Sequence, residues 1–272
     1  MTDLIPGFRL DGENIIFDGV VRTTSTAGTA VSEDFKGISF GNHKEGFLTV
    51  PSYGNIRTFV TGNDSTRVAA VASADFRSGT LRAGNKNHSS GGGVSLVIMI
   101  DADVPVFGTA RAMVTATEGI TFILRELGIG RAGCSTDSGC VDQDIVVACR
   151  PGSGLKLTGT GKHSKLGEFI GCSAIESVKA SASANGVSAG NIGASAALER
   201  LGIQYDKQLP ETTVSLLLAL LHIRDEIEWG MLPEAEGLRA AAAMASAVTG
   251  IGFNKDDDIR TIAEKSIAGI RD

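Results

Sequence analysis

The segment Val94–Ile100 limits the folds open to this chain more than any other stretch. Every position in it is apolar except Ser95, a pattern typical of a strand that is buried on both faces. The region that follows, Thr109–Leu127, has apolar residues at helical spacing, and Gly128 after it predicts a helix with a glycine cap. Ile145–Cys149 predicts the next strand.

A second helix is predicted over residues 164–182, and apolar and β-branched runs upstream predict more strands. Two of these runs, Glu13–Phe17 and Val20–Thr24, are separated by Asp18–Gly19, a turn dipeptide that indicates a β-hairpin. The other predicted strands are Ile38–Phe40, Ile56–Val60, Val68–Ala72 and Thr80–Ala83. We therefore expect one mixed sheet with the two long helices packed on it.

The composition changes near residue 181, where Ser181–Gly190 is rich in Ala, Ser and Gly and reads as a linker. We expect an α/β (α+β) fold, in which residues 1–185 form a mixed β-sheet with packed helices and residues 190–272 form a C-terminal helical appendage. The helices around Trp229 would suit the interface of a homo-oligomer, a lid or plain packing, and packing is the simplest. The predicted helices of the appendage are Ile192–Leu201, Glu211–Trp229, Pro233–Val248 and Asp257–Ile270.

Charge and composition exclude several classes of function. The net charge is −6 and Lys and Arg form no cluster, so we expect no nucleic-acid partner. Met1–Asp11 is acidic and has no apolar run, unlike a secretory signal. Runs such as Leu216–Leu221 are far too short to span a bilayer, so we expect a cytoplasmic protein without a membrane partner. The cysteines and histidines show no metal-binding spacing, and we expect no metal site.

Two polar stretches beside apolar elements are candidates for chemistry. Thr117 and Glu118 stand together in the 109–127 helix, where Glu118 is either an exposed or capping residue, which the pattern alone favours, or a general base. Residues 133–144 crowd hydroxyls and carboxylates into a loop before a strand, which suits either a solvated turn or a catalytic loop. The candidates in this loop are Thr136, Asp137, Asp142 and Asp144, with Cys140 as a less favoured nucleophile.

The third stretch, residues 158–171, is a glycine-rich loop that opens a helix. Ser164 suits the N-cap, Glu168 lies in the first turns and His163 lies just outside the helix. Backbone N–H groups at such a helix start can hold an anion or an oxyanion. A capped helix with a surface histidine is the alternative, and is slightly favoured by these residues alone. We expect the three stretches to meet in one cleft.

Together, "ARAMVTATEGITFILRELGIG", "DQDIVVAC" and "GKHSKLGEFIG" resemble the adenosylcobinamide amidohydrolase family. Members carry a V-x-T-A-T-E-A helix, a T-G-T-x-T-D loop before a V-V-A strand, and an H-T-x-L-G-x-L-I-G helix start. The matches of "SFGNHK", "LRAGN" and "GVSLVIMIDADVP" are looser. The resemblance covers residues 20–185 and is strongest over 94–175. The loop here departs from the family by reading S-T-D-S-G-C-V-D-Q-D, which leaves Asp137, Asp142 and Asp144 as candidates for the family aspartate.

The resemblance implies hydrolysis of the amide that joins a corrin propionate side chain to aminopropanol. Adenosylcobinamide would yield adenosylcobyric acid and 1-amino-2-propanol for corrinoid salvage, with the corrinoid as substrate and no cofactor. Glu118 or an aspartate of the loop would act as base and His163 would protonate the amine. The helix start at Ser164, or Asn85, would hold the oxyanion. The other residues that we expect to bind substrate are Asn42, His43, Thr117, Thr136 and Glu168.

Three other functions remain open from the sequence. One is a metal-dependent amidase, and another is a self-processing amidase that uses a Ser or Thr of residues 135–138 as its nucleophile. The third belongs to a different class, a corrinoid-binding or regulatory protein of the same fold without hydrolysis. The altered loop favours this third alternative.

Overall fold

The computed structural model describes residues 1–28, 30–77, 80–81, 83, 91–129, 137–187, 194–205 and 208–269. The chain divides into two compact units, which are described separately. The first comprises Met1–Ile123 and Ser138–Gly186, and the second comprises Leu124–Asp137 and Val187–Asp272. The predicted α+β fold, with a mixed sheet, packed helices and a helical C-terminal region, is confirmed. The domain boundaries at 1–185 and 190–272 stay a prediction.

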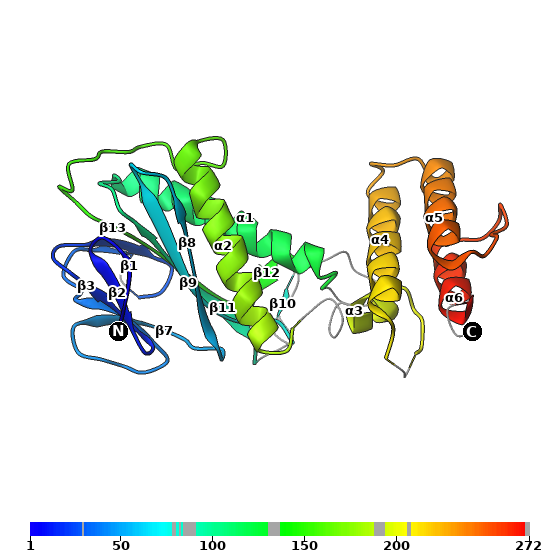
Figure 1. The fold of residues 1–272 in the computed structure, drawn as a ribbon, viewed down its shortest axis with the longest axis horizontal. Helices are drawn as coiled ribbons and strands as arrows, with labels where there is room; N and C mark the ends of the chain where they lie inside the picture. The colour runs from blue at the N-terminus through cyan, green and yellow to red at the C-terminus, as the bar shows by residue number, and fades with distance from the viewer. Residues whose placement is uncertain are drawn as a thin grey trace. The chain divides into compact units, whose positions relative to one another are not determined.

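A six-stranded mixed sheet forms the centre of the first unit (Figure 1). β11 and β13 are parallel, and all other neighbours are antiparallel. All eight residues of β11 are buried, as the apolar run at 94–100 predicted. In spatial order the strands are β5 (Val31–Ser32), β4 (Arg22–Ser25), β13 (Asp142–Cys149), β11 (Gly93–Ile100), β9 (Arg67–Asp75) and β8 (Ile56–Gly62).

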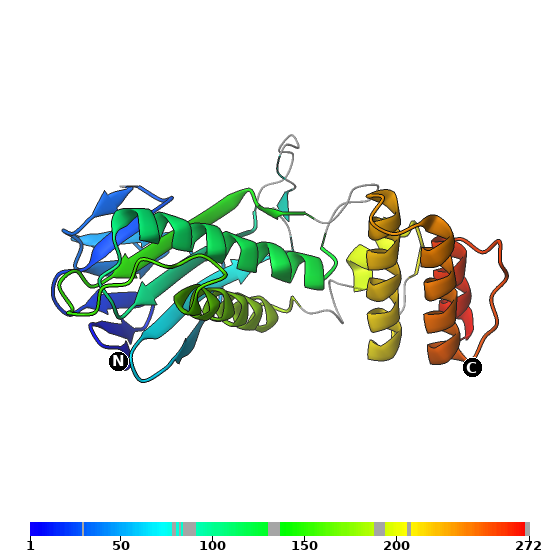
Figure 2. The same cartoon turned by 90° about the horizontal axis from the view of Figure 1, so that it is seen from above.

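Different layers cover the two faces of this sheet. Val97 and Met99 point to one side, where they pack against a five-stranded sheet. The opposite face carries α1 (Val106–Glu126) and α2 (Lys165–Ala184), which lie side by side along the strands in Figure 2. The strands of the five-stranded sheet are β1 (Thr2–Ile5), β2 (Phe8–Asp11), β3 (Asn14–Phe17), β6 (Gly37–Phe40) and β7 (Phe47–Val50), and a separate pair joins β10 (Thr80–Leu81) to β12 (Gly139–Cys140).

The two helices run along the sheet, from one end of its strands to the other. α1 follows the carboxyl end of β11, and α2 follows the carboxyl end of β13. Both helices therefore run back toward the end of the sheet where Gly93 and Asp142 begin these strands, which we call the amino edge. Near the end of α1, the Thr121 hydroxyl donates a hydrogen bond of 2.6 Å to the carbonyl of Ser138, shortly before β13.

The predicted hairpin across Asp18–Gly19 is wrong. β3 pairs with β2 on one side and with β6 on the other, so neither edge is left for β4. β4 instead joins the six-stranded sheet beside β13. A hairpin forms instead between β2 and β3, across the preceding turn at Gly12–Glu13, where Gly12 adopts φ +58°.

The second unit has its own apolar core, made by the helices α3 (Ala194–Arg200), α4 (Glu211–Glu228), α5 (Glu234–Thr249) and α6 (Ile259–Gly269). Pro210 and Pro233 precede α4 and α5, as expected of proline at helix starts. Inside the unit, the buried Arg200 guanidinium donates to both oxygens of the buried Asp225 carboxylate, at 2.8 and 2.6 Å. None of the helices in the described ranges has the length and apolar character that crossing a membrane requires.

Candidate active site

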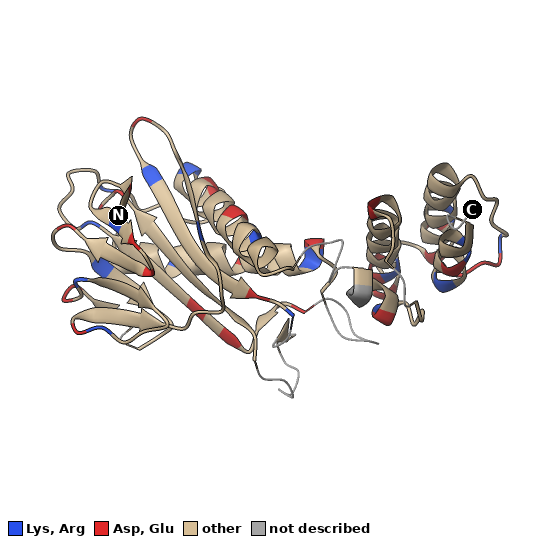
Figure 3. Cartoon of the chain, turned by 60° about the horizontal axis from the view of Figure 1, so that its bottom comes forward, with Lys and Arg blue, Asp and Glu red and all other residues tan. Residues whose placement is uncertain are grey.

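A group of polar side chains lies at the amino edge of the six-stranded sheet. Ser95 stands in register with Asp144 on one side and Ser73 on the other, while Asp142 stands opposite Gly93. Because alternate residues of a strand share a face, these side chains point to the side that the five-stranded sheet covers further along. Asp142 is exposed and Asp144 is partly buried. Figure 3 shows acidic positions at the ends of neighbouring strands of this sheet.

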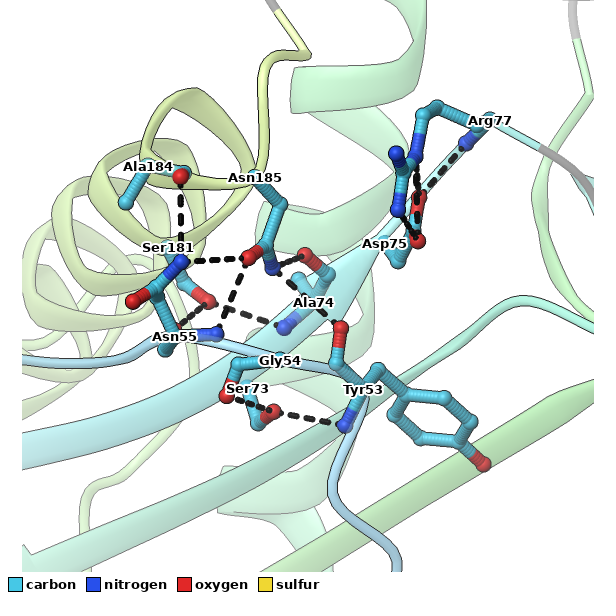
Figure 4. Close-up of polar contacts among 10 residues, drawn as sticks. All are labelled: Tyr53, Gly54, Asn55, Ser73, Ala74, Asp75, Arg77, Ser181, Ala184 and Asn185. Carbon is cyan, nitrogen blue, oxygen red and sulfur yellow. Dashed lines mark hydrogen bonds and ion pairs between the residues drawn. The ribbon is translucent and has the colours of Figure 1, made fainter.

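The ring of Tyr53 covers the start of β11. A Cβ placed on Gly93 would lie only 2.5 Å from Cζ of Tyr53 and 2.5 Å from the carbonyl oxygen of Asp142. Only glycine leaves room for the ring at this position. In Figure 4 the Tyr53 side chain points away from the polar network that holds its backbone.

That network ties the Tyr53 backbone to β9 and to the end of α2 (Figure 4). The Tyr53 N–H donates to the Ser73 hydroxyl at 2.8 Å, and the Asn185 side-chain amide donates to the carbonyls of Tyr53 at 3.2 Å and Ala74 at 2.8 Å. The Asn185 side-chain oxygen accepts the N–H of Asn55 at 2.9 Å. Gly54 lies between them at φ +122°, where a Cβ would come within 2.5 Å of the Asn185 oxygen.

Burial, with a further contribution from neighbouring acidic groups, raises the pKa of two titrating groups at this edge. Burial, followed by the charge of Asp142, raises the pKa of the Asp144 carboxyl group. Burial also raises the pKa of Tyr53 to about 12, with further contributions from Asp142, Asp144 and Cys140. Asp144 therefore retains a proton more readily than an exposed aspartate, and the Tyr53 hydroxyl stays protonated at neutral pH, where it can donate.

Asp144→Asn should raise the melting temperature at about pH 7 and leave it nearly unchanged at about pH 3. A raised pKa means that the folded chain binds the proton more tightly than the unfolded chain. Stability is therefore lost as the pH rises from the unfolded pKa through the folded pKa, and the loss persists at neutral pH. Asparagine does not ionise and removes this loss. Thermal unfolding of both proteins at the two pH values tests this, and a wild-type chain that melts higher than the variant at pH 7 would contradict it.

Asp75 adds a third carboxylate at the amino edge, opposite Gly93 on β9. Arg77 donates to it through Nε at 3.0 Å and through Nη2 at 2.5 Å. The hydrogen bonds from Arg77 lower the pKa of Asp75, so this group remains ionised and partly neutralised by its partner. Asp75 therefore differs from Asp144, although both are partly buried.

A second polar cluster lies on the opposite side of the sheet, between α1 and the loop before α2. Glu118 and Lys162 form an exposed ion pair at 3.1 Å. The Thr115 hydroxyl donates to the carbonyl of Thr160 at 3.1 Å, which fixes the loop against α1. At the start of α2, the Ser164 hydroxyl accepts the N–H of Gly167 at 3.0 Å. A cavity of about 270 Å³ is lined by Arg111, Thr158, Gly159, Thr160, Gly161, His163 and Ser164.

The structure does not bring all the predicted site residues into one cleft. Glu118 meets the 160–164 segment through Lys162. Asp142 and Asp144 point to the other face of β13, because they alternate with the residues that face the helices. Exposed His163 precedes α2 at the carboxyl ends of the strands, whereas the other end of this 20-residue helix reaches the amino edge. Such a helix is about 30 Å long, so His163 lies far from the aspartate pair.

The remaining predicted residues have separate surroundings. Asn42 and His43 are exposed in the loop between β6 and β7, next to Gly41, where a Cβ would lie 3.1 Å from Cβ of Ser52. Gly41 thus lies beside Ser52, the residue before Tyr53. The Thr117 hydroxyl donates to the carbonyl of Met113 in its own helix. Glu168 forms an ion pair with Lys165 at 2.8 Å. Asp137 is buried within the second unit. Asn85 and Thr136 lie outside the described residues.

Sequence reasoning missed Tyr53, Ser73 and Asn185 as members of this edge. Tyr53 lies in an irregular link between β7 and β8, and the side chain that holds it is 132 residues away. Ser95 was visible as the one polar residue in the run 94–100, and it marks the same edge.

Comparison with known proteins connects this architecture to one family. The family model CbiZ, described as adenosylcobinamide amidohydrolase, matches residues 18–189. A search of curated proteins found no match. The matched region is more than half of the chain and contains every strand of the six-stranded sheet, α1 and α2, together with Tyr53 and the Asp142–Asp144 pair. The chain therefore belongs to the adenosylcobinamide amidohydrolase family.

Proposed function

We propose that the chain hydrolyses adenosylcobinamide to adenosylcobyric acid and 1-amino-2-propanol in cytoplasmic corrinoid salvage. Membership of the family supports the reaction class, since the match spans the whole central sheet and the helices on it. The observation that carries the chemistry is the pair Asp142 and Asp144, two carboxyl groups on one face of β13 with unlike environments.

The two carboxyl groups suit the two proton transfers of amide hydrolysis. In the proposed reaction, the Asp142 carboxylate removes a proton from water while the water oxygen attacks the amide carbon. The carbon–nitrogen bond of the tetrahedral intermediate then breaks, and the leaving nitrogen takes a proton from Asp144. Asp142 has gained one proton and Asp144 has lost one, and exchange with solvent restores both. The reaction uses water and no cofactor.

The assignment of acid and base follows from the surroundings of each group. Asp144 is partly buried and its pKa is raised, so it holds a proton more readily than an ordinary aspartate. Asp142 is exposed, and its charge is among the causes of that raised pKa. Pairs of carboxyl groups in unlike environments divide acid and base roles in this way.

The other proposed base and acid, Glu118 and His163, have weaker support. Lys162 occupies a lone pair of Glu118, so this carboxylate already has a partner and is less free to take a proton from water. His163 stands at the other end of α2 from the carboxyl pair. We therefore favour the amino edge as the reaction centre.

Incubation of the purified chain with adenosylcobinamide, followed by chromatography of the corrinoid and assay of the free amine, tests the function. We expect adenosylcobyric acid and 1-amino-2-propanol in equal amounts. An intact chain mass equal to that of the sequence would exclude self-processing, and an undiminished rate after chelation would exclude a metal-dependent amidase. Corrinoid binding without either product would instead favour a binding or regulatory protein.

A further inference from the structure

Tyr53 lies beside the carboxyl pair and has no role in the proton transfers. Its Cζ atom, which carries the hydroxyl group, lies 2.5 Å from the place where a Cβ of Gly93 would be. Gly93 is the register partner of Asp142 on the adjacent strand, and adjacent strands lie about 4.8 Å apart. The Tyr53 ring therefore lies beside the strand position opposite Asp142, and both Asp142 and Asp144 act electrostatically on its hydroxyl group.

The fold holds Tyr53 in place through its main chain on both sides. Ser73 accepts its N–H and Asn185 donates to its carbonyl, so both the central sheet and the end of α2 fix the residue. Ser181 supports the same segment, since its hydroxyl donates to the carbonyl of Asn55 at 2.6 Å and accepts the N–H of Ala74 at 2.9 Å. A main chain held this firmly fixes the point from which the Tyr53 side chain extends, as preorganised catalysis requires.

The proposed reaction requires a hydrogen-bond donor at this edge. The tetrahedral intermediate carries negative charge on the former carbonyl oxygen, and a donor placed at that oxygen stabilises it. A tyrosine with a pKa of about 12 keeps its proton at neutral pH and can donate without adding charge. Among the residues that the structure describes, Arg77 is a cation at this edge, but it is already paired with Asp75.

Ser95 gives a separate indication that a ligand binds at this edge. Its side chain is fully buried, and its hydroxyl has no hydrogen-bond partner among the residues that the structure describes. A buried hydroxyl without a partner destabilises a fold. Ser95 is the exception in its strand, since every other residue from 94 to 100 is apolar. Ser95 faces the same side as Asp144, its register partner, so a polar ligand at the amino edge would satisfy it.

We propose that the Tyr53 hydroxyl is a catalytic hydrogen-bond donor to the carbonyl oxygen of the scissile amide and to the oxyanion formed from it, and that Asn185 positions Tyr53. The assignment rests on the proposed function. Tyr53 keeps its proton throughout, and its hydrogen bond strengthens as the carbonyl oxygen becomes negative. The aromatic ring itself covers Gly93 and has a packing role that the hydroxyl does not share.

Tyr53→Phe in the full chain removes the hydroxyl and keeps the ring. Loss of one oxyanion donor should lower kcat for adenosylcobinamide by about 10²–10³-fold. KM and the melting temperature should change little, because ring packing is kept and the donor acts mainly in the transition state. Tyr205→Phe, at the other tyrosine of the chain and outside the family match, is the matched control and should retain the wild-type kcat.

Asn185→Asp tests the positioning role, because it removes the amide donor to the Tyr53 carbonyl and keeps an acceptor for Asn55. It should lower kcat by up to about 10²-fold in the wild-type chain, as misplacement of a catalytic group does. In the Tyr53→Phe background it should lower kcat no further, since the hydroxyl is already absent. A purely structural Asn185 would lower kcat equally in both backgrounds, which would overturn the positioning role.

The outcomes separate this inference from the function on which it rests. If the wild-type chain hydrolyses adenosylcobinamide and Tyr53→Phe has a normal kcat, the role of Tyr53 is overturned and the amidohydrolase function stands. No hydrolysis by the wild-type chain overturns both. A loss of kcat in Tyr53→Phe that comes with an equal loss in Tyr205→Phe or with unfolding also counts against the donor role.

Discussion

Asp142→Asn should lower kcat for adenosylcobinamide hydrolysis by about 10²–10⁴-fold, the range of general acid–base catalysis. Asparagine keeps the shape of the side chain but cannot take a proton from water. KM should change little, because a large corrinoid makes most of its contacts elsewhere. Asp142 is exposed at the start of β13, so we expect the variant to stay folded, and melting curves check this. Steady-state rates from chromatography of the corrinoid products measure the effect.

Glu118→Gln is the matched control for this experiment. It makes the same change, from an exposed carboxylate to an amide, and it also lies within the family match. We expect near-normal turnover, because Glu118 is paired with Lys162 on the opposite side of the sheet. His163→Ala should likewise keep most of the rate. A large loss in Glu118→Gln with normal turnover in Asp142→Asn would move the base to α1, and normal turnover in all three variants would remove the hydrolytic role from these residues.

The sequence predicts those helices and strands that depend on residues within the segment itself. The helix predicted over Thr109–Leu127 is α1 at Val106–Glu126, and the apolar run 94–100 is the buried strand β11. Periodicity and caps within a segment determine such elements. Strand pairing is not local, and the Asp18–Gly19 turn shows the difference. Both edges of β3 are taken by β2 and β6, so the turn leads from one sheet to the other.

The candidate site was only partly readable for the same reason. Asp142 and Asp144 were candidates from their loop composition, and their spacing of two puts them on one face of a strand. Which layer covers that face depends on residues from distant strands, such as Phe8 and Phe40, that no local pattern connects to β13. Tyr53 gave no signal at all, since its place depends on Asn185, beyond the end of α2.

Asp144→Asn should also lower kcat by about 10²–10⁴-fold, and it should change the pH profile differently from Asp142→Asn. In the wild-type chain the acid must be protonated, so the rate falls at high pH. The raised pKa of Asp144 displaces the alkaline fall to a pH above the usual range of an aspartate. Without Asp144 the residual rate should lose that alkaline fall, whereas Asp142→Asn should keep it. Rates measured across a series of pH values for both variants test the assignment.

A comparison of substrates with different leaving amines also identifies which carboxyl group donates the proton. Protonation of the amine is required only if the leaving group is poor, so an amide of a more acidic amine should be less sensitive to Asp144→Asn than adenosylcobinamide is. Asp142→Asn should slow both substrates alike, because water must be activated in each case. Should the two variants exchange these behaviours, Asp142 is the acid and Asp144 the base. That result would mean that substrate binding, and not the burial that raises the pKa of Asp144 in the free chain, decides which group donates the proton.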